Sequence, residues 1–334
     1  MIQLSILDQS PVAEQQTQAE ALQNTIKLAQ EADKLGYTRF WVSEHHNTPS
    51  LTGSSPEVLV SHLAAKTERI RIGSGGIMLP HYSAYKVAEN FNVLEALAPG
   101  RIDMGIGRAP GGAPLSTLAL QDGQARNNKH FPVQVDELLA YTHGELPEGH
   151  RFQGLHATPR LTNHPHIWML GSSSYTAELA AEKGLPFSFA HFINAYDGRA
   201  AVKYYMDHFK PSLYYPKPKV VVSIQAVTAA TDEQAEELAQ STDWAVILIE
   251  SGVTLQGIPS LATASQLPKE PGLLERIREN RNRVLVGSPA TIKAQLEELQ
   301  ATYSVDEFML VSLTPDYEQK IEGYRLLADA FNLN

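Results

Sequence analysis

A short apolar run, Phe40-Trp41-Val42, is followed one residue later by an acid and two histidines, Glu44-His45-His46. Short runs rich in aromatic and β-branched residues are typical of buried strands. Titratable side chains directly after such a strand are well placed for proton transfer, because the pKa of histidine lies near neutral pH. The alternative is that two histidines begin an ordinary surface loop, and the pattern alone leaves both interpretations open.

Hydroxyl side chains cluster between an expected strand at 166–170 and the helix after it, at Ser172, Ser173, Ser174 and Thr176. Free backbone N–H groups, hydroxyl donors and the helix dipole together favour a phosphate. A serine that merely caps the helix is the alternative, although it explains only one of these hydroxyls. Arg108 follows the expected strand at 101–106 and either adds a bidentate cation to this phosphate site or is a solvated loop residue.

Gly75-Gly76 comes just after an expected strand at 70–74. Two adjacent glycines allow a flat ring to approach the backbone closely, or permit unusual dihedral angles. A plain turn is the alternative.

These segments are positioned by a regular alternation of strands and helices. Eight segments have the pattern of strands, at 4–7, 39–42, 70–74, 101–106, 166–170, 187–190, 220–227 and 308–311. Helix N-terminal patterns such as Thr17-Gln18-Ala19-Glu20 and Ser55-Pro56-Glu57 stand between strands. Strict alternation predicts the α/β class with a parallel sheet, and eight units predict a (β/α)8 TIM barrel. An open α/β sheet is the alternative, but no Gly-x-Gly-x-x-Gly follows the first strand.

We predict a single domain over residues 1–334, with insertions at about 107–125, 143–165 and 251–283. The first is predicted to be a long loop, and the third a mobile lid. Active sites in such barrels lie at the carboxyl ends of the strands. This rule places Asp8 and Gly107 near the histidines, the glycine pair and the serine cluster.

Composition narrows the possible functions. The chain has 27 basic and 37 acidic residues and a net charge of −10, without a basic run, so nucleic acid is not an expected partner. It has no cysteine, which excludes thiolate catalysis, disulfides and Cys-bound metals. We expect no catalytic metal, because His45 and His46 are consecutive and the His-x-His at 164–166 precedes its strand. No signal peptide or membrane span is expected, so we predict a cytoplasmic protein.

Several motifs together resemble the bacterial luciferase-like flavin-dependent monooxygenases. The segments that carry the resemblance are Glu44-His45-His46, Leu51-Thr52-Gly53, Gly73-Ser74-Gly75-Gly76-Ile77-Met78-Leu79-Pro80, Ala98-Pro99-Gly100-Arg101-Ile102-Asp103-Met104-Gly105-Ile106-Gly107-Arg108, Gly184-Leu185-Pro186 and Val286-Gly287-Ser288-Pro289. They occur in order over most of the chain.

The resemblance implies specific roles for individual residues. His45 matches the family histidine near the flavin, and Glu44 is assigned with it as a catalytic residue. Asp8 is assigned to cofactor binding, and Asp8 and Glu44 either orient His45 or close the pocket floor. Arg108, Ser173 and Thr176 match positions that hold the flavin phosphate, with Ser172 beside them. Gly75 and Gly76 match small residues joined by a cis peptide under the flavin ring. Gly107 replaces the reactive cysteine of the true luciferases, so we do not expect light emission.

The implied activity is that of an FMN-dependent monooxygenase. A separate flavin reductase supplies reduced FMN (FMNH2), O2 adds to form a C4a-peroxyflavin, and this species oxidises a small organic substrate. His45 acts as general acid or base with a pKa near the working pH. The alternatives are a non-catalytic flavin-binding protein and a deazaflavin-dependent oxidoreductase on the same barrel.

Family members commonly form homodimers through the helices expected at 56–66 and 83–97. The apolar and histidine side chains that could supply this contact are Val58, Leu59, His62, Val87, Phe91 and Leu94. The same side chains could instead pack against the barrel.

Overall fold

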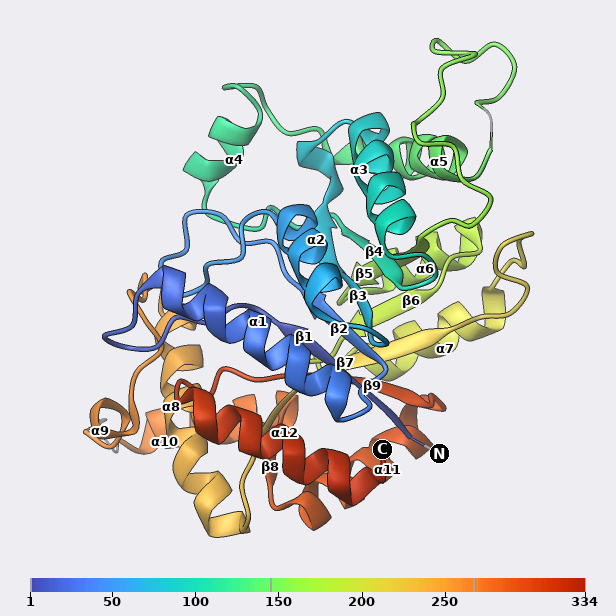
Figure 1. Cartoon of the computed structure of the whole chain (residues 1–334). Helices are drawn as coiled ribbons and strands as arrows, with labels where there is room; N and C mark the ends of the chain where they lie inside the picture. The colour runs from blue at the N-terminus through green and yellow to red at the C-terminus, as the bar shows by residue number, and fades with distance from the viewer. Residues whose placement is uncertain (1, 145, 267, 269, 334) are drawn as a thin grey trace.

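The computed structural model describes residues 2–144, 146–266, 268 and 270–333. Eight parallel strands close into a barrel, in the order β6-β5-β4-β3-β2-β1-β9-β7 with β7 paired back to β6 (Figure 1). Their bounds are β1 (Gln3–Asp8), β2 (Arg39–Val42), β3 (Arg71–Met78), β4 (Ile102–Gly107), β5 (His166–Gly171), β6 (Phe187–Ala190), β7 (Val220–Thr228) and β9 (Glu307–Val311). The predicted TIM barrel is confirmed.

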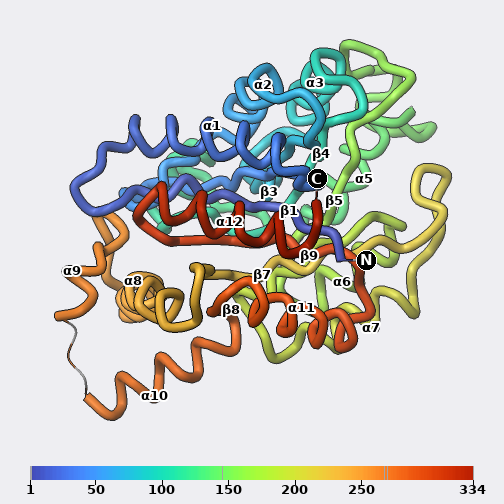
Figure 2. Tube along the Cα trace, turned by 60° about the horizontal axis from the view of Figure 1, so that its bottom comes forward, coloured from blue at the N-terminus to red at the C-terminus, as the bar shows by residue number. Residues whose placement is uncertain are grey.

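Helices surround the barrel, as the Cα trace shows in Figure 2. Their bounds are α1 (Gln18–Lys34), α2 (Pro56–Lys66), α3 (Ala84–Leu97), α4 (Pro114–Leu120), α5 (Phe131–His143), α6 (Ser174–Lys183), α7 (Gly198–His208), α8 (Asp232–Glu250), α9 (Leu261–Ala264), α10 (Pro271–Asn280), α11 (Pro289–Tyr303) and α12 (Tyr317–Phe331). Thr17 forms the predicted capping box with Glu20 at the start of α1. Among the described helices, none combines the length and apolar character that a membrane span needs.

One strand was not predicted. β8 (Val284–Gly287) pairs in parallel with Gln225–Thr228, the carboxyl-terminal part of β7. The preceding part of β7, from Val221 to Gln225, pairs with β9 inside the barrel. β8 therefore extends the sheet at the top of the barrel rather than completing it.

The predicted long loop at 107–125 contains the short helix α4, none of whose residues is buried. Ala113 and Pro114 provide the start of this helix, since proline is well suited to its first position. The segment expected to be a mobile lid, 251–283, contains α9 and α10. Leu255 and Ile258 of this region pack in a small cluster with Ala245 of α8.

The barrel interior is built in layers. At the amino ends of the strands, buried Arg39 forms ion pairs with Asp103 and Glu307. Above them, Trp41 and Trp168 make an edge-to-face contact with ring centroids 5.4 Å apart. These two rings belong to an apolar cluster that closes the floor of the barrel mouth.

Three of the predicted dimer-contact residues are buried within the chain. Val87, Phe91 and Leu94 pack in the main core, so their prediction as interface residues is wrong. Helical periodicity cannot separate these two roles, because an apolar helix face packs equally well on the barrel or on a partner. Val58 is 68% exposed on α2, and Leu97 is 70% exposed at the end of α3.

Candidate active site

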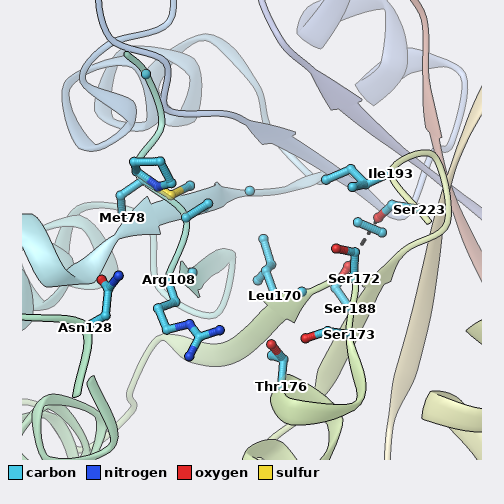
Figure 3. Close-up of a pocket in the computed structure, with 18 of the residues that line it drawn as sticks. Met78, Arg108, Asn128, Leu170, Ser172, Ser173, Thr176, Ser188, Ile193 and Ser223 are labelled. Atoms are coloured by element: carbon cyan, nitrogen blue, oxygen red, sulfur yellow. Dashed lines mark hydrogen bonds between the residues drawn. The ribbon is translucent and has the colours of Figure 1, made fainter. Parts of the chain in front are cut away.

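A cavity of about 1020 Å³ lies at the carboxyl ends of the strands (Figure 3). This volume reaches the upper end of the range for small-molecule sites, about 300–1,000 Å³. The cavity brings together most of the predicted cofactor residues, namely Gly75, Gly76, Gly107, Arg108, Ser172, Ser173 and Thr176. They come from the ends of β3, β4 and β5 and from the first turn of α6.

The first turn of α6 has unused hydrogen-bonding capacity. Ser173 occupies the N-cap position with extended backbone angles, but its side chain makes no capping hydrogen bond. The N–H groups at a helix N-terminus lack partners within the helix and attract anions. Figure 3 shows the Arg108 side chain extending toward Ser173 and Thr176. The predicted hydroxyl cluster and the predicted cation therefore face one another.

A second arginine, Arg126, also lines the cavity, and the sequence analysis did not identify it. Its Nη2 donates to the backbone carbonyls of Arg108 and Ala109, at 2.7 and 2.8 Å, and its buried Nε has no partner among the residues that the structure describes. Burial lowers the pKa of Arg126, and the charge of Arg108 lowers it further against the opposing effect of Glu44. No motif distinguishes this residue, because its position depends on how the loop after β4 folds back.

Neither guanidinium has an acidic partner. Within the described ranges, no carboxylate lies within ion-pair distance of Arg108 or Arg126. The Arg108 guanidinium instead lies 4.2 Å from the centre of the Tyr175 ring. Two neighbouring cations without an ion-pair partner among the described residues favour an anion between them and the α6 N-terminus.

The side of the cavity formed by β3 has no side chain at two successive positions. The peptide bond between Gly75 and Gly76 is cis, as the resemblance implied. A Cβ added to Gly76 would lie 2.7 Å from the carbonyl oxygen of Gly105 on β4. Glycine is therefore required here by the close approach of the neighbouring strand, while its bare backbone leaves a flat surface for a ring.

The two residues predicted to be catalytic are placed beside this region. Among the described residues that line the cavity, neither Glu44 nor His45 is found. The Glu44 carboxylate accepts hydrogen bonds from the Met78 backbone N–H at 2.9 Å and the Tyr82 hydroxyl at 2.8 Å, and it contacts His46 Nε2 at 2.7 Å. Glu44 thus ties together the residues that follow β2 and β3.

His45 is held in a setting that disfavours its charged form. Its Nδ1 lies 3.0 Å from the Ser43 hydroxyl, and its backbone N–H donates to the Gly53 carbonyl. Burial, with a smaller effect of His46, lowers the pKa of His45 to about 4. The imidazole is therefore neutral at pH 7, unlike the expectation of a pKa near the working pH.

Asp8 lies apart from the other predicted cofactor residues. Its buried carboxylate accepts hydrogen bonds from Lys320 Nζ and the Thr25 hydroxyl, both at 2.6 Å. Described residues that line the large cavity include Leu7 but not Asp8.

The predicted lid also lies away from the cavity. No described residue of 251–283 lines it, whereas Thr117 and Leu118 of α4 do.

Comparison with known proteins identifies the family. The model of the luciferase-like monooxygenases matches residues 2–305. The chain belongs to this family. It is 50% identical to the Bacillus subtilis protein YwcH over 99% of both chains. It is 37% identical to the N-acetyl-S-alkylcysteine monooxygenase of Bacillus subtilis, over 99% of this chain and 98% of that one. The crystal structure of apo-MsnO8 superposes with a TM-score of 0.90 at 34% identity, over 100% of this chain and 99% of that one.

Proposed function

We propose that this family member binds FMN and oxygenates a small organic substrate. Reduced FMN comes from a separate flavin reductase, and O2 is the second substrate. The observation that carries the proposal is a pair of guanidinium groups, Arg108 and Arg126, that have no carboxylate partner among the described residues. They line the cavity that also contains the uncapped N-terminus of α6. Such a set of donors suits a phosphate monoester.

The residues present fit the whole cofactor. Arg108, Ser173 and Thr176 hold the phosphate, joined by Arg126 and the backbone at Ser172. The bare backbone at Gly75-Gly76 supports the ring, and Gly107 leaves room beside it. The apolar remainder of the cavity excludes water from the reacting centre. Reduced FMN, when bound, supplies the two electrons that activate O2.

The related N-acetyl-S-alkylcysteine monooxygenase suggests a first substrate to test, a thioether. In such a reaction one oxygen atom of O2 forms the new sulfur–oxygen bond, the other leaves as water, and reduced FMN provides two electrons.

His45 and Glu44 take different parts in this proposal. His45, neutral because of its low pKa, acts as a neutral hydrogen-bonding group behind the cavity wall rather than as an acid. Glu44 positions the Met78 backbone beside the glycine pair. Asp8, which is paired with Lys320, supports the barrel mouth from outside the cavity.

The test supplies reduced FMN through a flavin reductase under 18O2, with N-acetyl-S-methylcysteine as thioether. The expected product is a sulfoxide that contains one 18O atom, and R108Q strongly lowers its yield at limiting FMN. Release of all the oxygen as hydrogen peroxide across a panel of thioethers and ketones would support a non-catalytic flavin protein. Tight binding of a deazaflavin with hydride transfer, and weak binding of FMN, would support the oxidoreductase alternative.

We also propose a homodimer that forms through α2 and α3. Val58 and Leu97 supply exposed apolar surface on these helices, together with Val93, which is 45% exposed. Light scattering at micromolar concentration is expected to give twice the mass of the chain. A wild-type mass equal to that of one chain would contradict the dimer. A dimer mass that L97D leaves unchanged would contradict the interface through α2 and α3.

A further inference from the structure

Two serines form a polar spot on the wall of the cavity opposite the glycine pair. Ser188 on β6 and Ser223 on β7 both line the cavity, and each is only 3% exposed. Their hydroxyl oxygens lie 3.2 Å apart (Figure 3). Ser188 alternates along β6 with Phe187 and Phe189, which point away from the cavity into the surrounding core.

The pair has one donor to spare. Two hydroxyl groups carry two O–H donors, and their mutual hydrogen bond uses one of them. Among the described residues, neither hydroxyl has a further partner. Buried O–H groups are normally satisfied, so an acceptor is expected where this second proton points.

The position of the pair separates it from the flavin surface. In the closed barrel, β7 lies four strands from β3 in either direction, through β2, β1 and β9 or through β4, β5 and β6. Ser223 therefore lies across the barrel mouth from Gly75-Gly76. A ring that rests on the glycine pair leaves the space toward Ser188 and Ser223 for the substrate.

The surroundings of the pair define the chemistry of what binds there. The lining residues next to the pair are Leu170, which is the register partner of Ser188, and Ala190, Phe192 and Ile193 at and after the end of β6. The two cationic lining residues, Arg108 and Arg126, belong to the loop after β4. A charged group at the serine wall would lose its hydration without gaining a counter-charge, whereas a neutral acceptor needs only the one spare O–H.

We propose that Ser188 and Ser223 form the substrate-recognition element of this site. One of them donates a hydrogen bond to a neutral oxygen acceptor on an otherwise apolar substrate. This inference rests on the proposed function, because that proposal assigns the opposite wall, at Gly75-Gly76, to the flavin ring. It assigns specificity to two strand residues that contact neither the phosphate nor the Gly75-Gly76 surface.

The test compares ligands that differ only in the acceptor. Acetophenone presents a carbonyl oxygen, α-methylstyrene replaces that oxygen by CH2, and benzoate replaces the methyl ketone by an anion. Affinities are measured by ligand-observed NMR, both with saturating oxidised FMN and without it. Acetophenone is expected to bind about 5–10-fold more tightly than α-methylstyrene, the effect of one buried neutral hydrogen bond. Benzoate is expected to bind more weakly than acetophenone to the FMN-loaded protein.

Variants locate the effect. In S188A/S223A the preference for the ketone over its hydrocarbon isostere is expected to disappear, while FMN affinity stays within about twofold of wild type. S5A is the matched control: Ser5 is also a buried hydroxyl of the barrel interior, but it donates to Glu307 at the other end. S5A is expected to keep the full preference.

Equal binding of the ketone and its isostere by the wild-type protein would overturn the inference, and this comparison needs no variant to fold. A tenfold loss of FMN affinity in S188A/S223A would also overturn it, because the pair would then contact the flavin. If the wild-type protein binds no FMN, the proposed function fails. The ketone preference of the flavin-free protein then decides the inference by itself.

Discussion

Both ends of the barrel interior contain arginine. Its charge is paired with carboxylates at the amino ends of the strands and has no acidic partner among the described residues at the carboxyl ends. At the amino ends of the strands, Arg39 is 1% exposed and donates to Asp103 at 2.6 Å and to Glu307 at 2.5 Å. At the carboxyl ends, Arg108 and Arg126 line an open cavity without an acidic partner in the described ranges.

At the amino end, the two carboxylates that pair with Arg39 each have several donors. Asp103 accepts from Arg39, from Arg71 and from the Trp41 indole, and Glu307 also accepts from Ser5. Burial raises the pKa of Asp103, but the charges of Arg39 and Arg71 outweigh this and hold it well below its usual range. This end needs no further ligand, and it closes the barrel.

Buried charge alone therefore does not indicate a ligand-binding site. A perturbed pKa and complete ion pairs indicate a structural plug at one end. Incomplete pairing beside a cavity indicates a ligand at the other.

Removing the central cation of the closed end is expected to destabilise the fold strongly. R39M leaves Asp103 and Glu307 buried without their shared counter-charge, a loss of about 3–5 kcal/mol in the free energy of unfolding. Urea denaturation measures it. The control is R325M, which breaks the partly exposed pair of Arg325 and Glu31 and is expected to change the stability much less. Similar stabilities of R39M and R325M would contradict the structural role assigned to the ion pairs around Arg39.

Removing a cation from the open end is expected to affect binding and not stability. R108Q should weaken FMN about 10–100-fold, the effect of losing a charge-assisted hydrogen bond, with little change in urea midpoint. Fluorescence titration of FMN measures the affinity. R126Q is expected to act in the same direction. A large loss of stability in R108Q with unchanged FMN affinity would show that both ends are structural.

Two N-cap serines, Ser288 and Ser173, allow the same comparison between a structural and a ligand-binding role, with smaller expected effects. The Ser288 side chain accepts from the Thr291 N–H at the start of α11, whereas Ser173 makes no capping hydrogen bond in α6. S288A should cost about 1 kcal/mol of stability and leave FMN binding unchanged. S173A should keep its stability and bind FMN about fivefold more weakly. The reverse pattern would mean that Ser173 is an ordinary cap.

The pKa of His45 predicts a pH effect on stability. Its pKa is about 4 in the folded protein, against a usual value of 6.5. Below pH 6.5 the unfolded chain therefore binds a proton that the folded chain does not, and stability falls as the pH falls toward 4. H45Q is expected to lose less stability than wild type between pH 6.5 and 4.5 in urea titrations. Parallel curves for the two proteins would show that His45 is not held neutral.

The sequence allows much of the open end to be predicted, because barrel strands and helix caps have short-range patterns. Arg108, Ser173 and Thr176 each lie within six residues after an expected strand, so the barrel rule alone brings them together. Arg126 was missed because it reaches the site through a loop that folds back onto Arg108. Ser188 was missed because it lies inside a strand, where a small polar residue carries no distinctive pattern.

The burial of individual side chains could not be predicted from short-range sequence patterns. Val87, Phe91 and Leu94 have the helical spacing of an interface and of a core alike. The environment of His45 depends on Ser43 and His46 and on burial by neighbouring elements. The pairing of β8 with the end of β7 is a long-range property that short-range patterns do not show.

The most direct test of the account compares FMN with riboflavin, which has the same ring but no phosphate. Calorimetric titration of the wild-type protein is expected to give at least about 100-fold tighter binding of FMN, since several charge-assisted and N-terminal hydrogen bonds go to the phosphate. R108Q should remove much of that difference. Equal affinities of the wild-type protein for FMN and riboflavin would contradict the claim that the open end is an anion site.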